Sequence, residues 1–302
     1  MTGAAVCITL LPMMPQHAER GGDDAPRLEA SATFLAGRDA ETSGRLPEAR
    51  RAYEQALAAE PARADWLYRL GCVCLKLQDP VSAENAFLRA LEHEPSSATT
   101  LTNLGVSLDR QGRREEAVRA YRRSLQYGGT AVAHHNLGSI HAEEGRTDEA
   151  IRSFEAAIAM APDGEAFVNL GLVHMARGDL GLALGCFEKG VACEPGYALA
   201  HYHAALCLMK TGRYELACRG FEKAWALDAR LARVPYHVGV CLHKLERYEA
   251  ARHSLERALE FFPDDGRLHF QLALTCDALG LPQEARAHYG RARALDRAGR
   301  PT

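Results

Sequence analysis

Residues 169–195 read NLGLVHMARGDLGLALGCFEKGVACEP, and this stretch contains the pattern that decides the fold. Gly171 is followed twelve residues later by Ala183 and, after four more residues, by Phe187. Positions four apart lie on the same face of a helix, one turn from each other. Pro195 closes the stretch, because proline lacks the N–H that a helix interior needs. The stretch therefore predicts two helices that form a hairpin.

The same three positions recur in eight units along the chain. Alanines spaced 33 or 34 residues apart open the second half of each unit: Ala49, Ala83, Ala117, Ala150, Ala183, Ala217, Ala251 and Ala285. The large residues four places later are Tyr53, Phe87, Tyr121, Phe154, Phe187, Phe221, Leu255 and Tyr289. The small residues twelve places earlier are Gly37, Gly71, Gly105, Gly138, Gly171, Ala205, Gly239 and Ala273. Columns that stay in register across the whole chain indicate an internal repeat.

Side-chain size explains these columns. Two helices approach closely only where their side chains are small, so glycine or alanine of one helix should face alanine of the other. The aromatic residue then fills the space one turn along. Turn signals should separate the two helices of a unit, as in Gln111-Gly112-Arg113 and Thr211-Gly212-Arg213. Prolines should end second helices at Pro61, Pro95, Pro162, Pro195 and Pro263.

The pattern resembles the tetratricopeptide repeat (TPR) family, in which leucine-glycine is followed by A-x-x-x-F and a proline. Leu170-Gly171, Ala183, Phe187 and Pro195 match it, and so does the unit around Gly71. The resemblance implies an all-α fold, a right-handed α-solenoid superhelix of about eight helix-turn-helix hairpins, with first helices on the concave wall.

The domain organisation follows from the repeat register. We expect residues 1–29 to form a disordered tail, residues 30–297 the repeat array and residues 298–302 a C-terminal tail. The repeats should start near residues 30, 64, 98, 131, 164, 198, 232 and 266.

Composition narrows the function classes. The formal charge of −3 gives no net field that would attract nucleic acid or an anionic membrane. Nine cysteines without framework spacing favour free thiols in a reducing compartment, so we expect a cytoplasmic protein. The nucleotide-binding, hydrolase and zinc-protease motifs are absent. The sequence therefore predicts a protein that is not an enzyme and needs no cofactor or metal.

One column of polar residues is a candidate peptide-binding site. The residue two places before each small residue should point into the superhelix. These residues are Leu35, Arg69, Asn103, Asn136, Asn169, His203, His237 and Gln271, and we call the seven polar ones the ladder. An amide side chain both donates and accepts hydrogen bonds. A ladder of such groups is suited to the backbone of an extended peptide.

The ladder is similar to the concave asparagines in the repeat region of O-linked N-acetylglucosamine transferases, which implies a grip on a substrate backbone. Asn103, Asn136 and Asn169 match by residue type, whereas the histidines and glutamine depart from it, and a transferase domain is missing. The alternative is that asparagine is common at this position and solvated here.

Aromatic residues lie beside the ladder, each one place before a ladder residue: Tyr68, Tyr202, Tyr236 and Phe270. Aromatic anchors flanked by polar groups are typical of peptide-binding grooves. The alternative is partial burial between neighbouring first helices.

Histidines offer a further possibility, because His203, His237 and His243 should cluster on the concave wall, where protonation near pH 6 would tune a partner. His134, His141, His174, His201 and His269 occupy packing positions and should be interior histidines.

The function that the sequence favours is a scaffold or adaptor that holds an extended peptide segment of a protein partner in its concave groove. The alternatives are a self-associating structural scaffold, which would be a homo-oligomer, and a substrate-recruiting subunit for a separately encoded glycosyltransferase. The sequence does not identify the partner.

Overall fold

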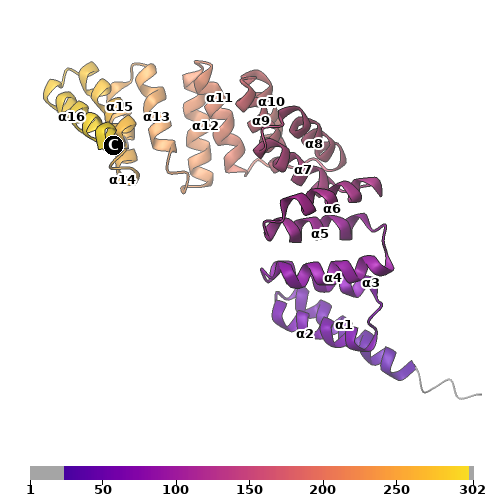
Figure 1. Ribbon diagram of the computed structural model, residues 1–302. Coiled ribbons are helices and arrows are strands. Elements are labelled where there is room, and N and C mark those ends of the chain that lie inside the picture. The colour runs from indigo at the N-terminus through magenta and orange to yellow at the C-terminus, as the bar shows by residue number, and fades with distance from the viewer. Residues whose placement is uncertain (1–23, 299–302) are drawn as a thin grey trace, which may run out of the picture. The chain divides into compact units, whose positions relative to one another are not determined.

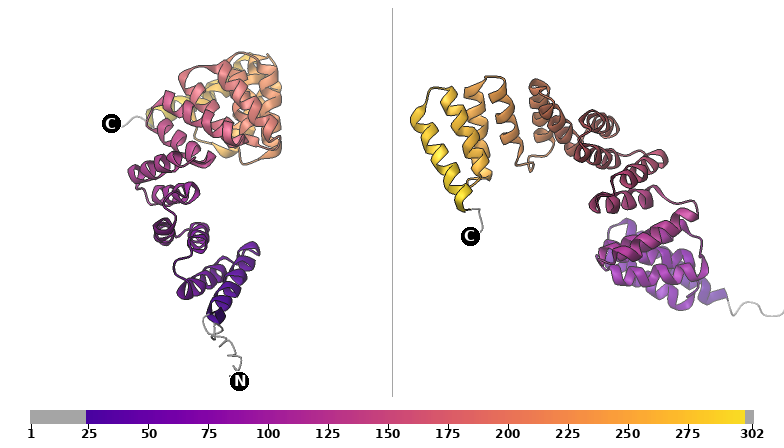
Figure 2. Two further views of the ribbon diagram at one scale, coloured as in Figure 1. Left: turned by 90° about the vertical axis from the view of Figure 1, so that its right-hand side faces the viewer. Right: turned by 45° about the horizontal axis from the view of Figure 1, so that its top comes forward.

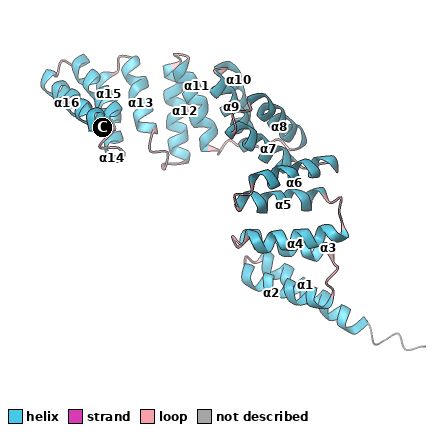
Figure 3. Cartoon of the chain, in the orientation of Figure 1, coloured by secondary structure: helices cyan, strands magenta, loops and turns pink. Residues whose placement is uncertain are grey.

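The computed structural model describes residues 24–298, and these residues form sixteen α-helices and no strand (Figure 1, Figure 3). The helices are α1 (Asp24–Thr42), α2 (Leu46–Ala59), α3 (Ala64–Lys76), α4 (Pro80–His93), α5 (Ala98–Arg110), α6 (Arg114–Gln126), α7 (Ala131–Glu143), α8 (Thr147–Met160), α9 (Gly164–Arg177), α10 (Leu180–Cys193), α11 (Ala198–Lys210), α12 (Tyr214–Leu227), α13 (Val234–Lys244), α14 (Tyr248–Phe261), α15 (Gly266–Ala278) and α16 (Pro282–Ala298). The predicted all-α fold class is confirmed.

Odd-numbered helices are the first helices of hairpins, and even-numbered helices are the second helices. Second helices pack against their own first helix, as α2 does on α1 and α12 on α11, and against the first helix that follows, as α2 does on α3 and α12 on α13. The chain divides into two compact units, residues 1–117 and 118–302, which we describe separately. Figure 2 shows the paired helices from two further sides. Within each unit, the stacked hairpins form a solenoid in which each pair is covered by its neighbours.

The predicted close approach inside each hairpin is present. A Cβ atom added to Gly171 in α9 would lie 2.6 Å from a ring carbon of Phe187 in α10. Gly138 in α7 has the same relation to Phe154 in α8, at 2.8 Å. Both aromatic rings are fully buried, as is Ala183. The glycine column is therefore required by the contact between the two helices of a hairpin.

Helix ends follow the predicted signals. Gly178 ends α9 with a φ of 92°, in the left-handed region that favours glycine. At the start of α9, the Asp163 carboxylate accepts a hydrogen bond from the N–H of Ala166 at 2.7 Å. The prolines lie just beyond the ends of α2, α4, α8, α10 and α14, at Pro61, Pro95, Pro162, Pro195 and Pro263.

The ends of the array relate to the predicted boundaries as follows. Helix α1 begins at Asp24, whereas the array was expected to start near residue 30, so the residues between them are helical. Helix α16 extends to Ala298. Residues 1–23 and 299–302 lie outside the described part of the chain, so the two predicted tails stay predictions.

Two further features bear on the expected class of protein. The eight cysteines in the described residues are all free thiols, and five of them are buried. Between residues 24 and 298, every helix is too short or too polar to cross a lipid bilayer.

We predict that Gly171→Leu destabilises the protein, because the new side chain collides with the Phe187 ring. Overpacking of this kind costs about 1–3 kcal/mol, and the collision here is with a buried ring. The matched control is Gly185→Leu in α10, where an added Cβ meets no atom within 4 Å. Thermal unfolding measures both, and an unchanged midpoint for Gly171→Leu would contradict the register of the hairpins.

Candidate functional site

The three ladder asparagines are partly buried, and each donates a hydrogen bond to a side chain of an adjacent helix. Asn103 Nδ2 on α5 donates to the Tyr68 hydroxyl on α3 at 3.1 Å. Asn136 Nδ2 on α7 donates to the Tyr121 hydroxyl on α6 at 3.0 Å. These amides therefore link helices of neighbouring repeats, which neither the peptide-binding hypothesis nor the solvated alternative anticipated.

The same linkage recurs at the next repeats. Asn169 Nδ2 on α9 lies 3.2 Å from His135 Nε2 on α7. His237 Nε2 on α13 lies 3.1 Å from the Tyr202 hydroxyl on α11. Asn103, Asn169 and His237 thus each bond the residue just before the ladder position of the preceding repeat, whereas Asn136 bonds a residue of the second helix α6. Each bond contributes about 0.5–1.5 kcal/mol to stability.

The first ladder residue, Arg69, is more exposed. Its guanidinium lies 3.6 Å from the Glu41 carboxylate, which also binds Lys76 at 2.7 Å. An ion pair at this level of exposure contributes at most about 1 kcal/mol. Arg69 is therefore still accessible to a partner in the first unit.

His203 on α11 and His237 on α13 each stack on the aromatic ring of the preceding hairpin, on α10 and α12 respectively. The ring centroids are 5.4 Å apart for His203 and Phe187, and 5.2 Å apart for His237 and Phe221. The Nδ1 atoms of both histidines are buried without a hydrogen-bond partner in the described structure. Burial lowers the pKa of each to about 4, with the Arg233 charge contributing at His237.

The expected cluster of three histidines is not formed by these contacts. His243 Nδ1 lies 3.0 Å from Thr275 Oγ1, and its ring meets Tyr248. Among the packing histidines, His141, His174 and His269 are buried, whereas His134 and His201 are half-buried. No group of three metal-binding side chains converges within residues 24–298.

The last repeats differ from the others at the ladder. By the pattern above, Gln271 on α15 should bond Tyr236 on α13, but within the described residues these two side chains do not hydrogen-bond. Phe270, beside Gln271, is 50% exposed, and its ring meets Tyr289 on α16 with centroids 5.8 Å apart. Polar and aromatic groups are therefore accessible together at this end of the second unit.

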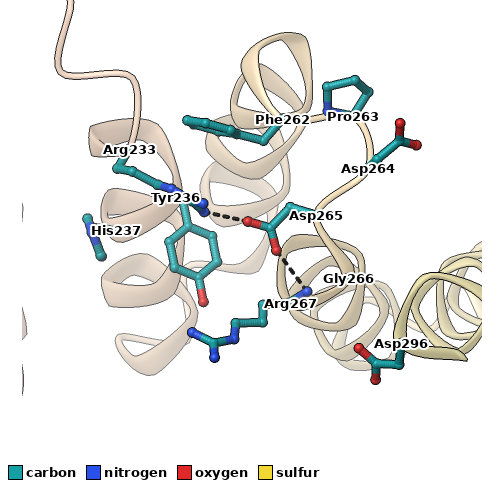
Figure 4. Close-up of a pocket in the computed structure, with 10 residues that line it drawn as sticks. All are labelled: Arg233, Tyr236, His237, Phe262, Pro263, Asp264, Asp265, Gly266, Arg267 and Asp296. Carbon is teal, nitrogen blue, oxygen red and sulfur yellow. Dashed lines mark hydrogen bonds and ion pairs between the residues drawn. The ribbon is translucent and has the colours of Figure 1, made fainter. Parts of the chain in front are cut away.

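Two adjoining cavities lie among these residues, with volumes of about 810 and 660 Å³. We call them together the C-terminal groove; both are lined by Tyr236, Gly266, Arg267 and Asp296. The first also contains Arg233, His237, Phe262, Pro263, Asp264 and Asp265, and the second contains Phe270, Gln271, Tyr289, Ala292 and Arg293. In Figure 4, the side chains of Tyr236 and Arg267 extend into the same space between α13 and α15.

The wall of the groove is fixed by a charged cluster. The Arg233 guanidinium bonds the Asp265 carboxylate and lies over the Phe262 ring at 4.1 Å from its centroid (Figure 4). Asp265 also accepts from the backbone N–H of Arg267 at 2.9 Å, which caps α15. Burial alone would raise the pKa of Asp265, but the hydrogen bond from Arg233 and those from the backbone N–H groups of Leu268 and Arg267 lower this pKa. Asp265 is therefore ionised at neutral pH.

His237, Gln271, Tyr236 and Phe270 in this groove were predicted from the sequence as binding residues, whereas its arginines and acidic residues were not among the predicted site residues. One signal for the arginines was present. Arg233 and Arg267 each precede a ladder residue by four places, which puts them one turn away on the same helix face. Phe262 and Asp265 come from a loop and Asp296 from the last helix, outside the ladder and the three columns that define the repeat.

Comparisons with known proteins place the whole array in one family. Two family models, both described as tetratricopeptide repeat, match the chain. One matches residues 34–98, 72–133, 102–165, 135–198 and 168–232, and the other matches residues 230–298. A search of curated proteins found no match.

Solved structures of MamA proteins share the fold. MamA from Desulfovibrio magneticus RS-1, from its residue 41 to the end, is 22% identical with a TM-score of 0.54, over 57% of this chain and 97% of that chain. MamA of MSR-1 is 26% identical with a TM-score of 0.51, over 56% of this chain and 98% of that one. Another MamA crystal structure is 22% identical with a TM-score of 0.53, over 56% and 93% of the two chains.

We predict that the second unit loses stability as the pH falls from 6.5 toward 4. The unfolded chain binds protons on His203 and His237 near pH 6.5, whereas the folded chain binds them only near pH 4. Protonation therefore favours the unfolded chain between pH 6.5 and 4. At pH 4 the free energy of unfolding is lower by about 2–3 kcal/mol for each histidine.

The test is the double variant His203→Asn, His237→Asn, which puts the ladder asparagine of the third, fourth and fifth repeats at both positions. Its melting temperature should fall less between pH 6.5 and 4 than that of wild type. His253→Asn, an exposed histidine on α14, is the control. Equal pH dependence of all three proteins would show that the two stacked histidines do not govern it.

Proposed function

Because the chain belongs to the tetratricopeptide repeat family, we propose that it acts as a protein-interaction scaffold that holds an extended peptide segment of a partner against its first helices. The family match over residues 34–298 supports an interaction scaffold in general. The C-terminal groove is the observation that carries the specific binding mode. It combines accessible aromatic rings, an unbonded amide and charged groups on three helices of one unit.

Dimensions of the groove suit a peptide in extended conformation. Phe270 and Arg267 are three residues apart on α15, which places their Cβ atoms about 5–6 Å apart. Alternate side chains of an extended chain point the same way and are about 6.5 Å apart. Two such side chains of a bound peptide therefore match the spacing of two groove residues.

The ladder asparagines have a smaller role in peptide binding than the sequence alone predicted. Their Nδ2 atoms already bond Tyr68, Tyr121 or His135. What they still offer a peptide is the carbonyl oxygen of each amide, which accepts a backbone N–H, and at Asn136 and Asn169 the second N–H of the amide group. Their first role in this proposal is to hold helices of neighbouring repeats in place, and peptide contact is the second. The likeness to the transferase repeats therefore stays a hypothesis about Asn103, Asn136 and Asn169.

The location we propose is the cytoplasm, since the described cysteines are free thiols, as expected in a reducing compartment. Cysteines buried among apolar neighbours behave as small hydrophobic residues, so this support is compositional.

Self-association is a second candidate function, favoured by one edge of α1. Leu28 is 70% exposed, and Ala32 and Ala36 on the same side of the helix are also exposed. In the next repeat, the residue that corresponds to Ala32 is Trp66, which is buried. Two copies of the chain would bury this edge by packing α1 against α1.

Light scattering over a wide concentration range tests self-association. Wild type should form dimers as the concentration rises, and Leu28→Glu should shift the equilibrium to monomer because it places a charge in the contact. A wild-type protein that stays monomeric at every concentration would reject this second function.

For peptide binding, we predict that Phe270→Ala lowers the affinity for unstructured peptides at least tenfold, since half-exposed aromatic anchors contribute most of the binding energy in such grooves. Fluorescence anisotropy with a labelled peptide library measures the affinity. The matched control is Leu182→Ala on the second helix α10, whose side chain is 56% exposed. If both variants bind as wild type does, the peptide does not bind at the C-terminal groove.

A further inference from the structure

Two arginines of the C-terminal groove have guanidinium groups that make no ion pair within residues 24–298. Arg267 comes from α15 and Arg293 from α16, and both are exposed and line the second cavity. A guanidinium is charged at every physiological pH and presents five N–H donors. Two such groups facing one cavity favour an acidic ligand.

The other charged groups of the groove are already compensated, with one exception. Arg233 is bonded to Asp265, and Asp264 is bonded to Arg291 at 2.6 Å. The exception is Asp296 on α16, whose carboxylate makes no ion pair in the described part of the chain. It would lie 3.1 Å from a Cβ atom added to Gly266. Two unpaired arginines against one unpaired aspartate leave the groove with a surplus of one positive charge.

This balance points to a single carboxylate and not to a run of acids. Binding one carboxylate near Arg267 and Arg293 would neutralise the surplus. A second acid or a dianionic group nearby would meet the Asp296 carboxylate, and like charges at short range disfavour binding. Arginine binds carboxylates by two parallel N–H···O bonds, which also fixes the orientation of the ligand.

Apolar groups next to the arginines define the rest of the ligand. Phe270 is half-exposed and lies one helical turn from Arg267, and Tyr236 lines both cavities. We propose that the C-terminal groove recognises an extended peptide with one aspartate or glutamate side chain two residues from an aromatic residue. This inference rests on the proposed peptide-binding function and specifies its ligand.

The test uses the full chain and amidated peptides, which lack a C-terminal carboxylate. The probe is a labelled Gly/Ser peptide with one Phe and one Glu in the order Phe-x-Glu, compared with the same peptide carrying Gln in place of Glu. Wild type should bind the Glu peptide at least tenfold more tightly than the Gln peptide. The difference should shrink as the salt concentration rises.

Two double variants identify the residues. Arg267→Gln, Arg293→Gln should bind the Glu peptide no better than the Gln peptide, because the preference for the acid is lost. Arg286→Gln, Arg297→Gln removes the same charge from exposed positions of α16 outside the groove lining and should keep the tenfold preference.

The outcomes separate this inference from the proposed function. If wild type binds both peptides equally and Phe270→Ala weakens both, the acidic preference is wrong and the peptide groove stands. If neither peptide binds, both proposals fail. If a Phe-x-phosphoserine peptide binds more tightly than the Glu peptide and depends on Arg267 and Arg293, the carboxylate assignment is overturned. The Gln peptide is also measured with a free C-terminal carboxylate. If this free-acid peptide binds and its amidated form does not, the groove binds a chain terminus and the side-chain assignment is wrong.

Discussion

The close contact between the small residue of a first helix and the aromatic or leucine side chain of its second helix, as at Gly71, Gly138, Gly171 and Gly239, determines the rest of the structure. At Gly171 and Phe187 the contact leaves no room for a Cβ atom. It sets the distance between the two helices of a hairpin, and each hairpin then covers the next. The residues next to this contact, two places earlier on the first helix, are held in one row because the contact recurs every 33 or 34 residues. The ladder is a consequence of this packing.

Hydrogen bonds use much of the ladder for the structure itself. Asn103, Asn169 and His237 each bond the preceding repeat, and the stacked histidines are too buried to be charged at neutral pH. Polar groups that are satisfied within the fold offer little free energy to a ligand, because binding would only exchange one hydrogen bond for another. Within the described residues, Gln271 makes no such bond, and it lines the C-terminal groove. At the ladder position, this groove therefore contains a polar side chain that the inter-repeat hydrogen bonds do not use, although Arg233 and Asp265 still join the last two repeats there.

The sequence predicted the periodic features and missed those that the period does not govern. The columns containing Gly171, Ala183 and Phe187 determined the hairpins, since a close helix contact tolerates few residue types. The hydrogen bond from Asn103 to Tyr68 joins the first helices of two neighbouring repeats. It was not predicted, because the sequence columns were considered one repeat at a time and the asparagine amide was expected to face a peptide or solvent. The groove depends on Phe262 and Asp265 in a loop and on Asp296 in the last helix, which lie outside the columns that define the repeat. Only Arg233 and Arg267, one turn before ladder residues, could have been selected from spacing alone.

Hydrogen–deuterium exchange of the full chain, with and without a saturating Phe-x-Glu peptide, tests the central claim most directly. The claim is that recognition occurs on the first helices at the C-terminal groove. The account predicts slower exchange confined to α13, α15 and the adjoining turn of α16, with α10 and α12 unchanged. Protection of the second helices α10, α12 and α14 without protection of α13 or α15 would contradict it.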